Sequence, residues 1–108
     1  MEINILGTNY EIKKLSESDY PKLKTLDANG LAELYSKQLI INSEMNRQTG
    51  NEYANFEGYE NKTIRHEIIH AFFHESGLVD YCQDEDLVNW LALQAPKMIK
   101  AFQEANCL

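Results

Sequence analysis

The sequence has little of several features that define whole classes of protein. It contains only two cysteines, Cys82 and Cys107, too few for the disulfide framework of a small secreted domain. No apolar run approaches the roughly 20 residues that cross a bilayer. The N-terminus, Met1 to Asn4, does not have the basic and then apolar pattern of a secretion signal. We therefore expect a cytoplasmic protein with reduced thiols and no membrane partner.

Positive charge is also scarce. The chain has 10 Lys and Arg residues against 17 Asp and Glu, which gives a formal net charge of −7. Such a charge repels phosphate backbones, so we expect no nucleic-acid partner. Hydrophobic residues make up 44% of the 108 positions, enough for one ordinary core and too few for two. The sequence therefore predicts a single domain over residues 1–108.

The first third of the chain has the alternating pattern of β-strands. Ile3 and Ile5 alternate with other residues up to position 6, and Tyr10 and Ile12 resume the alternation after a turn expected at residues 7–9. This pattern predicts a β-hairpin. The polar stretch from residue 16 to 22 is expected to form a short helix or a loop.

A second strand pair is predicted at Leu31–Tyr35 and Gln38–Asn42, with a tight turn near Ser36. Three consecutive apolar residues, 39–41, indicate a strand that is buried on both faces. The polar, Asn-rich stretch Ser43–Gly58 is expected to be a long loop, and long loops in small domains are often functional.

From about Glu60 the pattern changes to that of a helix. Ile64, Ile68 and Phe72 recur at four-residue spacing, and Gly77 offers a left-handed stop. The acidic residues 84–86 suit the positive start of a second helix, in which Pro96 should produce two pieces that meet near residue 95. The stripe that this helix is expected to bury consists of Leu87, Trp90, Leu91, Met98 and Phe102. The predicted fold class is α+β, with a small antiparallel or mixed sheet followed by a helical half.

The chemistry is carried by the motif His-Glu-x-x-His at residues 66–70. On a helix, His66 and His70 lie one turn apart on the same face, where both imidazoles can reach one Zn²⁺ ion. Glu67 is rotated by about 100° from His66. It therefore borders the metal without entering its coordination shell, and can take a proton from a water molecule there as a general base.

A catalytic zinc site needs a third protein ligand. His74 lies about 12 Å from His66 along a helix, too far to share one tetrahedral ion. Glu85 in the next helix is the better candidate, with Asp80 as a weaker alternative. Asn89, four residues after Glu85, lies on the same helix face and is expected to hydrogen-bond the far nitrogen of a ligating histidine.

A peptidase site also needs a group that donates to the oxyanion of the reaction. The candidates are Tyr81, Tyr35 and His74, and the sequence does not choose among them. The hairpin that contains Gln38–Asn42 offers an edge strand that would hold a peptide or protein substrate by strand addition.

The stretch Ile64–Lys100, with the motif His66 to His70, then Glu75 to Leu78, then Glu85 to Trp90, resembles small phage and prophage metallopeptidase-like proteins. These look like minimal relatives of the ImmA/IrrE group within the Glu-ligand zincins. The resemblance implies a minimal zincin-like domain in which His66, His70 and Glu85 bind zinc, Glu67 is the general base and Asn89 orients a histidine. The Ala-Asn/Asp-x-Phe-Ala run of larger members is replaced here by Leu87–Leu91, which weakens the transfer of a repressor-cleaving role.

Three functions remain open at this point. The first is a zinc-dependent metallopeptidase that hydrolyses peptide bonds. The second is a zinc-stabilised, phage-encoded regulatory or interaction module without turnover. The third is a metal-free helical adaptor whose interface is formed by Trp90, Met98 and Phe102. The substrate and the oligomeric state do not follow from the sequence.

Overall fold

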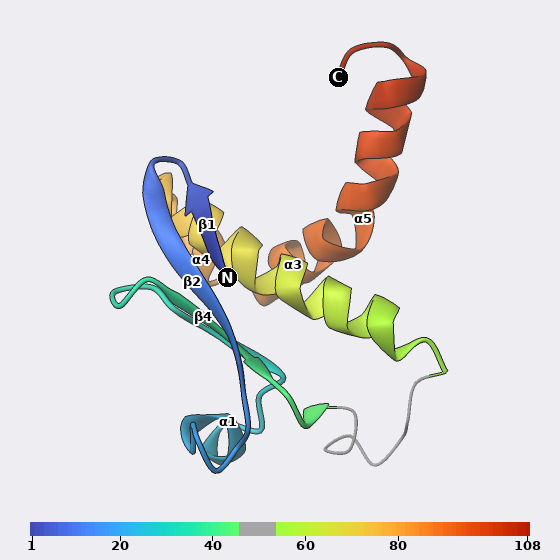
Figure 1. The fold of residues 1–108 in the computed structure, drawn as a ribbon. Helices are drawn as coiled ribbons and strands as arrows, with labels where there is room; N and C mark the ends of the chain where they lie inside the picture. Colours follow the sequence, from blue (N-terminus) through green and yellow to red (C-terminus); the bar gives the residue numbers. More distant parts are fainter. Residues whose placement is uncertain (46–53) are drawn as a thin grey trace.

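The computed structural model describes residues 1–45 and 54–108. Four strands come first and the longer helices follow (Figure 1), so the predicted α+β class is confirmed. The elements in chain order are β1 (Glu2–Ile5), β2 (Thr8–Leu15), α1 (Lys22–Thr25), β3 (Gly30–Glu33), β4 (Gln38–Asn42), α3 (Phe56–Glu75), α4 (Val79–Cys82) and α5 (Glu85–Glu104). None of the described helices is long and apolar enough to cross a membrane.

The four strands form one mixed sheet in the order β1-β2-β4-β3. β1 and β2 form the predicted antiparallel hairpin, with Ile3 opposite Tyr10. Its turn lies at Leu6 and Gly7, one residue earlier than expected, and both residues have positive φ. A turn with two left-handed residues matches the right-handed twist of the strands. The neighbouring pair, β2 and β4, is parallel, and this pairing makes the sheet mixed.

The second hairpin is also present. β4 has the predicted bounds, Gln38–Asn42, and Leu39 to Ile41 are fully buried as expected. β3 runs Gly30–Glu33 and is therefore shifted by one to two residues from the predicted Leu31–Tyr35. β4 lies inside the sheet, between β2 and β3, so the free edge of this hairpin is β3.

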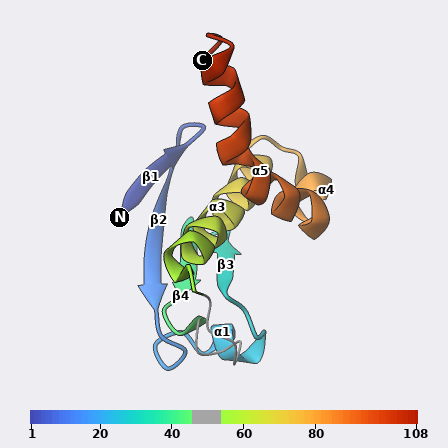
Figure 2. The same ribbon diagram turned by 90° about the vertical axis from the view of Figure 1, so that its right-hand side faces the viewer.

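The helix α3 packs across the sheet, and α5 packs on the side of α3 that faces away from the sheet (Figure 2). Ala71 of α3 joins Ile5, Tyr10 and Leu39 of the sheet in a buried cluster. α3 begins at Phe56, so residues 56–58 of the expected loop are helical, while residues 46–53 of that loop lie outside the described residues. The helix ends at Glu75, and Gly77 follows with φ +79°, as predicted.

The helix α5 starts as expected, because the Asp84 side chain accepts a hydrogen bond from the Leu87 amide at 3.1 Å. The expected division into two pieces near residue 95 is wrong, because Pro96 lies inside one helix of 20 residues, which bends (Figure 1). Proline has no N–H to donate to the carbonyl of residue i−4, here Ala92. Arg65 of α3 donates to that carbonyl instead, at 2.8 Å from its Nε.

The predicted buried stripe of α5 is wrong at three of its five positions. Trp90 is 53% exposed, and Met98 and Phe102 are also exposed. The residues that α5 buries are Val88 and Ala92, in the half of the helix that packs on α3. Amphipathic spacing predicts burial only where another element covers the apolar face, and no described element covers the C-terminal half of α5.

Candidate metal centre

The two histidines of the motif lie side by side on α3. Their ring centroids are 4.9 Å apart and their Nε2 atoms are 3.2 Å apart. This closeness follows from the four-residue spacing, which stacks side chains on successive turns of a helix. Both side chains are largely buried, with 15% of His66 and 11% of His70 exposed.

The third predicted ligand reaches the same point from the first turn of α5. Glu85 places Oε2 at 3.0 Å from His66 Nε2 and Oε1 at 2.9 Å from His70 Nε2. The short helix α4 turns the chain back between these elements. Among the described residues, His66, His70 and Glu85 form the one cluster whose ligand atoms all lie within 4.8 Å of one another. Asp80, the alternative ligand, is not part of it.

The hydrogen bonding of His70 leaves a lone pair that faces a negative charge. His70 Nδ1 donates to the carbonyl oxygen of Cys82 at 2.6 Å, and a carbonyl can only accept. In the neutral imidazole, Nε2 therefore carries a lone pair, and this lone pair faces a Glu85 carboxylate oxygen. Two acceptors at 2.9 Å repel each other unless a cation lies between them. The arrangement therefore suits a bound metal ion.

The distances also suit the geometry of zinc. Two ligand atoms at 2.0–2.1 Å from one ion, at the tetrahedral angle, are about 3.3 Å apart. Here the two Nε2 atoms are 3.2 Å apart, and each lies 2.9 or 3.0 Å from a different oxygen of the Glu85 carboxylate. Two imidazole nitrogens and one carboxylate form a typical catalytic zinc set, which leaves one position open. The Glu85 side chain is 67% exposed, so this open side faces solvent.

His66 is prepared as a neutral ligand. Burial lowers its pKa, and the positive charge that His70 carries when protonated acts in the same direction, whereas the Glu85 carboxylate opposes the shift. Its far nitrogen, Nδ1, is buried and has no hydrogen-bond partner among the described residues. We expected Asn89 to bond such a nitrogen. In this structure it bonds neither histidine, because the Cys82 carbonyl accepts from His70 Nδ1 and His66 Nδ1 has no partner among the described residues. A bond from Asn89 to His66 Nδ1 in the metal-bound protein stays a prediction.

Glu67 lies next to the three ligands in a buried environment, with only 6% of the residue exposed. Burial, together with the charge of Glu85, raises the pKa of Glu67 to about 8, although Lys62 acts in the opposite direction. A bound divalent cation would stabilise the charged carboxylate and lower this pKa. Such a shift brings the pKa toward neutrality, where a general base is most effective.

Space for the Glu67 side chain is provided by a glycine of the sheet. A Cβ on Gly30, the first residue of β3, would lie 2.9 Å from Glu67 Oε2 and 3.0 Å from its Cγ. Real Cβ contacts are essentially never shorter than 3.0 Å. Gly30 thus permits the close contact between the edge strand and the carboxylate.

The three candidates for the oxyanion donor do not lie at the cluster. The rings of Tyr35 and His74 contact each other, with centroids 5.6 Å apart. Tyr81 contacts Phe73 instead. Within the described part of the chain, none of these three candidates lines the cavities that border Glu67. Their role at the oxyanion stays a prediction.

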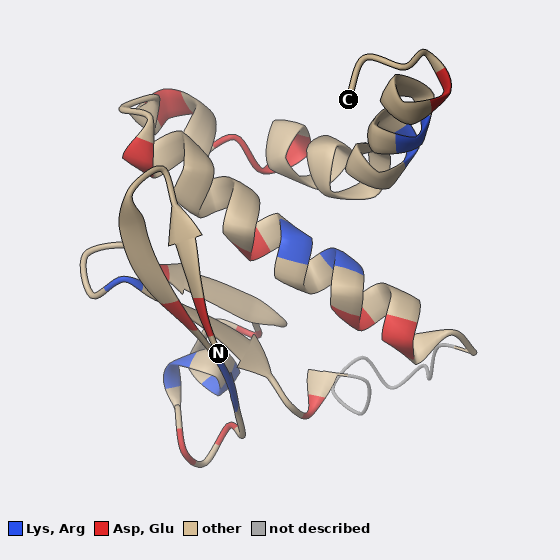
Figure 3. Ribbon diagram, turned by 45° about the horizontal axis from the view of Figure 1, so that its top comes forward, with Lys and Arg blue, Asp and Glu red and all other residues tan. Residues whose placement is uncertain are grey.

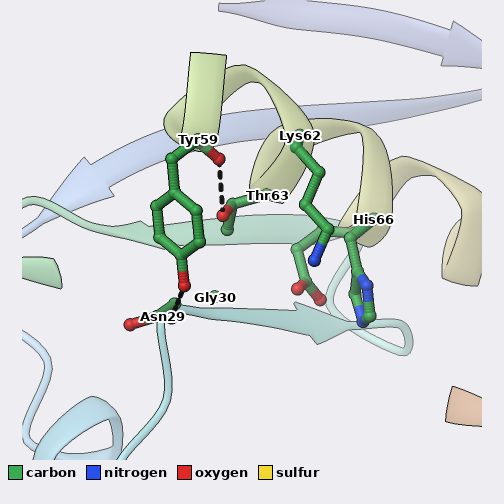
Figure 4. A pocket seen from close by; sticks show the side chains of 7 residues that line it. Asn29, Gly30, Tyr59, Lys62, Thr63 and His66 are labelled. Carbon is green, nitrogen blue, oxygen red and sulfur yellow. Dashed lines mark hydrogen bonds between the residues drawn. The ribbon is translucent and has the colours of Figure 1, made fainter. Parts of the chain in front are cut away.

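Three features of the site were not found from the sequence: Gly30, the Cys82 carbonyl and Lys62. Figure 4 shows Lys62 and His66 extending in the same direction from neighbouring turns of α3, opposite the pair formed by Tyr59 and Asn29. The one signal for Lys62 was its position, four residues before His66 on the same helix face. A backbone carbonyl leaves no signal in the sequence.

No protein family, curated protein or solved structure matches this sequence. The resemblance to the ImmA/IrrE group therefore rests on the motif residues alone. The function has to be inferred from the geometry of the site.

Proposed function

We propose that the protein is a cytoplasmic zinc-dependent peptidase, with His66, His70 and Glu85 as zinc ligands and Glu67 as general base. One observation carries the proposal. Two imidazole nitrogens, 3.2 Å apart, each lie within 3.0 Å of an oxygen of the Glu85 carboxylate, beside the buried carboxylate of Glu67, which is not part of this cluster. A structural zinc site would normally have four protein ligands, and three leave a position for water or substrate.

The residues divide the reaction between them. Zinc in this site would polarise a water molecule and the carbonyl of the scissile peptide bond. Glu67 accepts the proton that the water loses on attack and then delivers it to the leaving amine. The contact with Gly30 holds the carboxylate in position, and its burial keeps bulk water from competing for the proton. The hydrogen bond from His70 to the Cys82 carbonyl fixes the ring that presents Nε2 to the metal.

The edge strand β3 offers a place for the substrate backbone. Among the described residues it pairs only with β4, and its first residue, Gly30, lies against Glu67. An extended peptide that adds to this edge would pass over Glu67. This arrangement supports an extended peptide, rather than a small molecule, as the substrate.

Metal analysis tests the site. Purified protein is expected to carry about one zinc per chain, and His66→Ala and His70→Ala are each expected to lose it. His74→Ala is the matched control, because the third histidine lies outside the cluster and its loss should leave the zinc content unchanged. Full zinc retention in both His66→Ala and His70→Ala would refute the assignment of the ligands.

Cleavage of a peptide library tests the reaction. The zinc-loaded protein is expected to cleave peptides, and Glu67→Gln is expected to reduce cleavage by at least about a hundredfold, as the loss of a general base typically does. The zinc content of this variant should stay at the wild-type level, because Glu67 is not a ligand. Equal cleavage by wild type and Glu67→Gln would show that the activity comes from elsewhere.

A second candidate function is a zinc-stabilised regulatory or interaction module without turnover. It is favoured by the lack of any expected oxyanion donor at the cavities that border Glu67, among the described residues. It is also favoured by the position of the ligands, which would join α3 to α5 through the metal. This candidate predicts zinc binding, a zinc-dependent melting temperature and no cleavage of any peptide.

A further inference from the structure

Two cavities lie on either side of Glu67. The first, of about 160 Å³, is bordered by Gly30, Lys62 and His66. The second, of about 350 Å³, is bordered by Leu31, His70 and Glu85. Glu67 lines both cavities, and so does β3, through successive residues. A peptide bound along β3 would therefore reach one cavity on each side of the metal.

The first cavity is polar and contains a positive charge. Its walls include Asn29 and Tyr59, whose side chains hydrogen-bond each other at 2.6 Å, and Thr63, which donates to the Tyr59 carbonyl at 3.0 Å. Lys62 enters the cavity between these groups and His66 (Figure 4).

The ammonium group of Lys62 makes no hydrogen bond and no ion pair with any described residue. The carboxylates of Glu67 and Glu85 attract it from beyond ion-pair distance, and this attraction offsets part of the lowering of its pKa by burial. The other basic residue of α3, Arg65, is already bonded to Ala92. Lys62 and Arg65 lie in the middle of α3, where Figure 3 shows blue basic segments flanked by red acidic ones. Burial lowers the pKa of Lys62, which reflects the cost of holding an unpaired charge there.

The second cavity has a different character. Besides the site residues it is lined by Leu31, Ala32 and Leu34 of the β3 region, and by Cys82 and Gln83. Apolar side chains predominate on the strand side. The two cavities therefore differ in charge as well as in place.

We propose that the cavity at Lys62 binds a carboxylate of the substrate, and that the cavity at Leu31 binds an apolar side chain on the other side of the scissile bond. This proposal rests on the proposed peptidase function. The physical reason is charge. The protein as a whole carries −7, so a carboxylate in this cavity needs a cation close by. Lys62 supplies an ammonium group that has no hydrogen-bond partner among the described residues. Either an acidic side chain or a free C-terminus provides the required carboxylate, and both fit a space of several water volumes.

Peptide binding to the zinc-loaded Glu67→Gln variant tests the cavity without requiring turnover. Four acetylated peptides that share one apolar residue are compared by calorimetry, with Glu or Gln at one position and a free or amidated C-terminus. Carboxylate peptides should bind about tenfold more tightly than their neutral counterparts, the effect of one hydrogen bond to a charged group. Which of the two carboxylates produces the difference identifies the source.

Variants of Lys62 assign the effect. Lys62→Gln, made in the same background, should abolish the tenfold preference, and Lys62→Arg should keep part of it. Lys100→Gln is the matched control for lost charge, because Lys100 is exposed in the far half of α5, and it should leave the preference unchanged. The proposal would be overturned if charged and neutral peptides bound equally tightly, or if no peptide bound.

Cleavage of the same peptides by the Glu67-containing protein separates this proposal from the peptidase function. If carboxylate peptides bind more tightly but none is cleaved, the peptidase function is rejected and the carboxylate-binding cavity stands. If peptides are cleaved without any preference for a carboxylate, the carboxylate-binding cavity is rejected and the peptidase function stands. If Lys62→Gln lowered kcat equally for all four peptides and left KM unchanged, Lys62 would be acting on the reaction centre, and the proposed cavity would be wrong.

Discussion

The side chain of Arg65 completes the backbone hydrogen bonding of α5 at Ala92, where the following proline cannot. Its Nε lies 2.8 Å from the Ala92 carbonyl oxygen, the acceptor that Pro96 leaves without a helical donor. The bend in α5 is thereby linked to a side chain of α3, the helix that carries two of the proposed metal ligands. The bend of α5 and its docking on α3 share one contact.

This contact predicts a coupling between the two positions. Arg65→Met should destabilise the protein by about 1–3 kcal/mol, the cost of leaving a buried acceptor without a partner. In a Pro96→Ala background the new amide can donate to Ala92, so Arg65→Met should cost less. Thermal melts of both single variants and the double variant give the coupling free energy. Strict additivity would mean that Arg65 does not replace the missing amide.

Gly30→Ala should separate catalysis from metal binding. The added methyl group would lie 2.9 Å from the Glu67 carboxylate, so the carboxylate has to move. Ordinary contact begins at 3.4 Å, so the carboxylate has to move by about 0.5 Å, and a displacement of about 1 Å at a catalytic group costs on the order of a hundredfold in rate. We therefore expect a loss of roughly tenfold in kcat/KM with zinc content unchanged, because the atoms nearest to the new methyl group all belong to Glu67. The melting temperature of the zinc-loaded variant controls for general damage to the fold, and unchanged kcat/KM would refute the positioning role.

Asn89→Ala tests the orientation of His66. If Asn89 bonds the unpaired Nδ1 of His66, its loss should weaken zinc affinity by about 10–100-fold. If Asn89 only faces solvent, the substitution should slightly stabilise the helix, because alanine is the better helix former. Chelator competition measures the first effect and thermal melting the second. Unchanged affinity together with a higher melting temperature would remove Asn89 from the site.

Glu75 makes the stability of the fold dependent on pH. Its carboxylate accepts hydrogen bonds from Tyr10 at 2.5 Å, Lys37 at 2.9 Å and Thr8 at 2.9 Å. These bonds, that from Tyr10 first, lower the pKa of Glu75 from 4.5 to about 2. A lowered pKa contributes stability that is complete above the unfolded value and is lost as the pH falls toward the folded value.

Glu75→Gln should therefore lower the melting temperature by a few degrees at pH 6, and by progressively less between pH 4.5 and pH 2. Melts in the presence of a chelator keep zinc release out of the comparison. Glu104→Gln, at the exposed end of α5, is the control and should have no pH-dependent effect. An equal deficit of the Glu75→Gln variant at pH 6 and pH 2.5 would contradict the assignment.

The two free thiols should differ in reactivity. Cys82 is 5% exposed, and its thiol donates to the His70 carbonyl at 3.2 Å, whereas Cys107 is exposed. Burial raises the pKa of the Cys82 thiol, which reduces its reactive thiolate form. Maleimide at pH 7 should label one thiol per chain quickly and the second only after unfolding. In Cys107→Ser the fast labelling should disappear, and fast labelling that persists would place Cys82 at the surface.

Local patterns account for the parts of the fold that the sequence predicted. Gln38–Asn42 was found with its bounds because three buried residues in a row mark a strand covered on both faces. The parallel pairing of β2 with β4 was not predicted. It joins two strands separated in the sequence by the short helix α1 and the strand β3, and no short-range pattern encodes it. The exposed stripe of α5 failed for a related reason, since periodicity describes a face and not its partner.

The residues of the candidate site likewise include some that local patterns predict and some that only the fold reveals. His66, His70 and Glu85 were predictable, because a four-residue helical spacing and one short connection bring them together. Gly30 reads in the sequence as a turn residue, and only the fold places it against Glu67. Lys62 reads as an ordinary surface charge until its lack of a partner is visible.

The contact between Gly30 and Glu67 also has a consequence for how such a protein can change over generations. The proposed metal ligands lie within residues 66–85, whereas the space for the proposed base, Glu67, is left by a strand far upstream. One nucleotide substitution turns a glycine codon into an alanine codon. On the proposed function, that step would slow hydrolysis and leave the three proposed metal ligands unchanged. A lineage that began as such a peptidase would thus lose much of its activity in one mutation and keep its metal-binding residues.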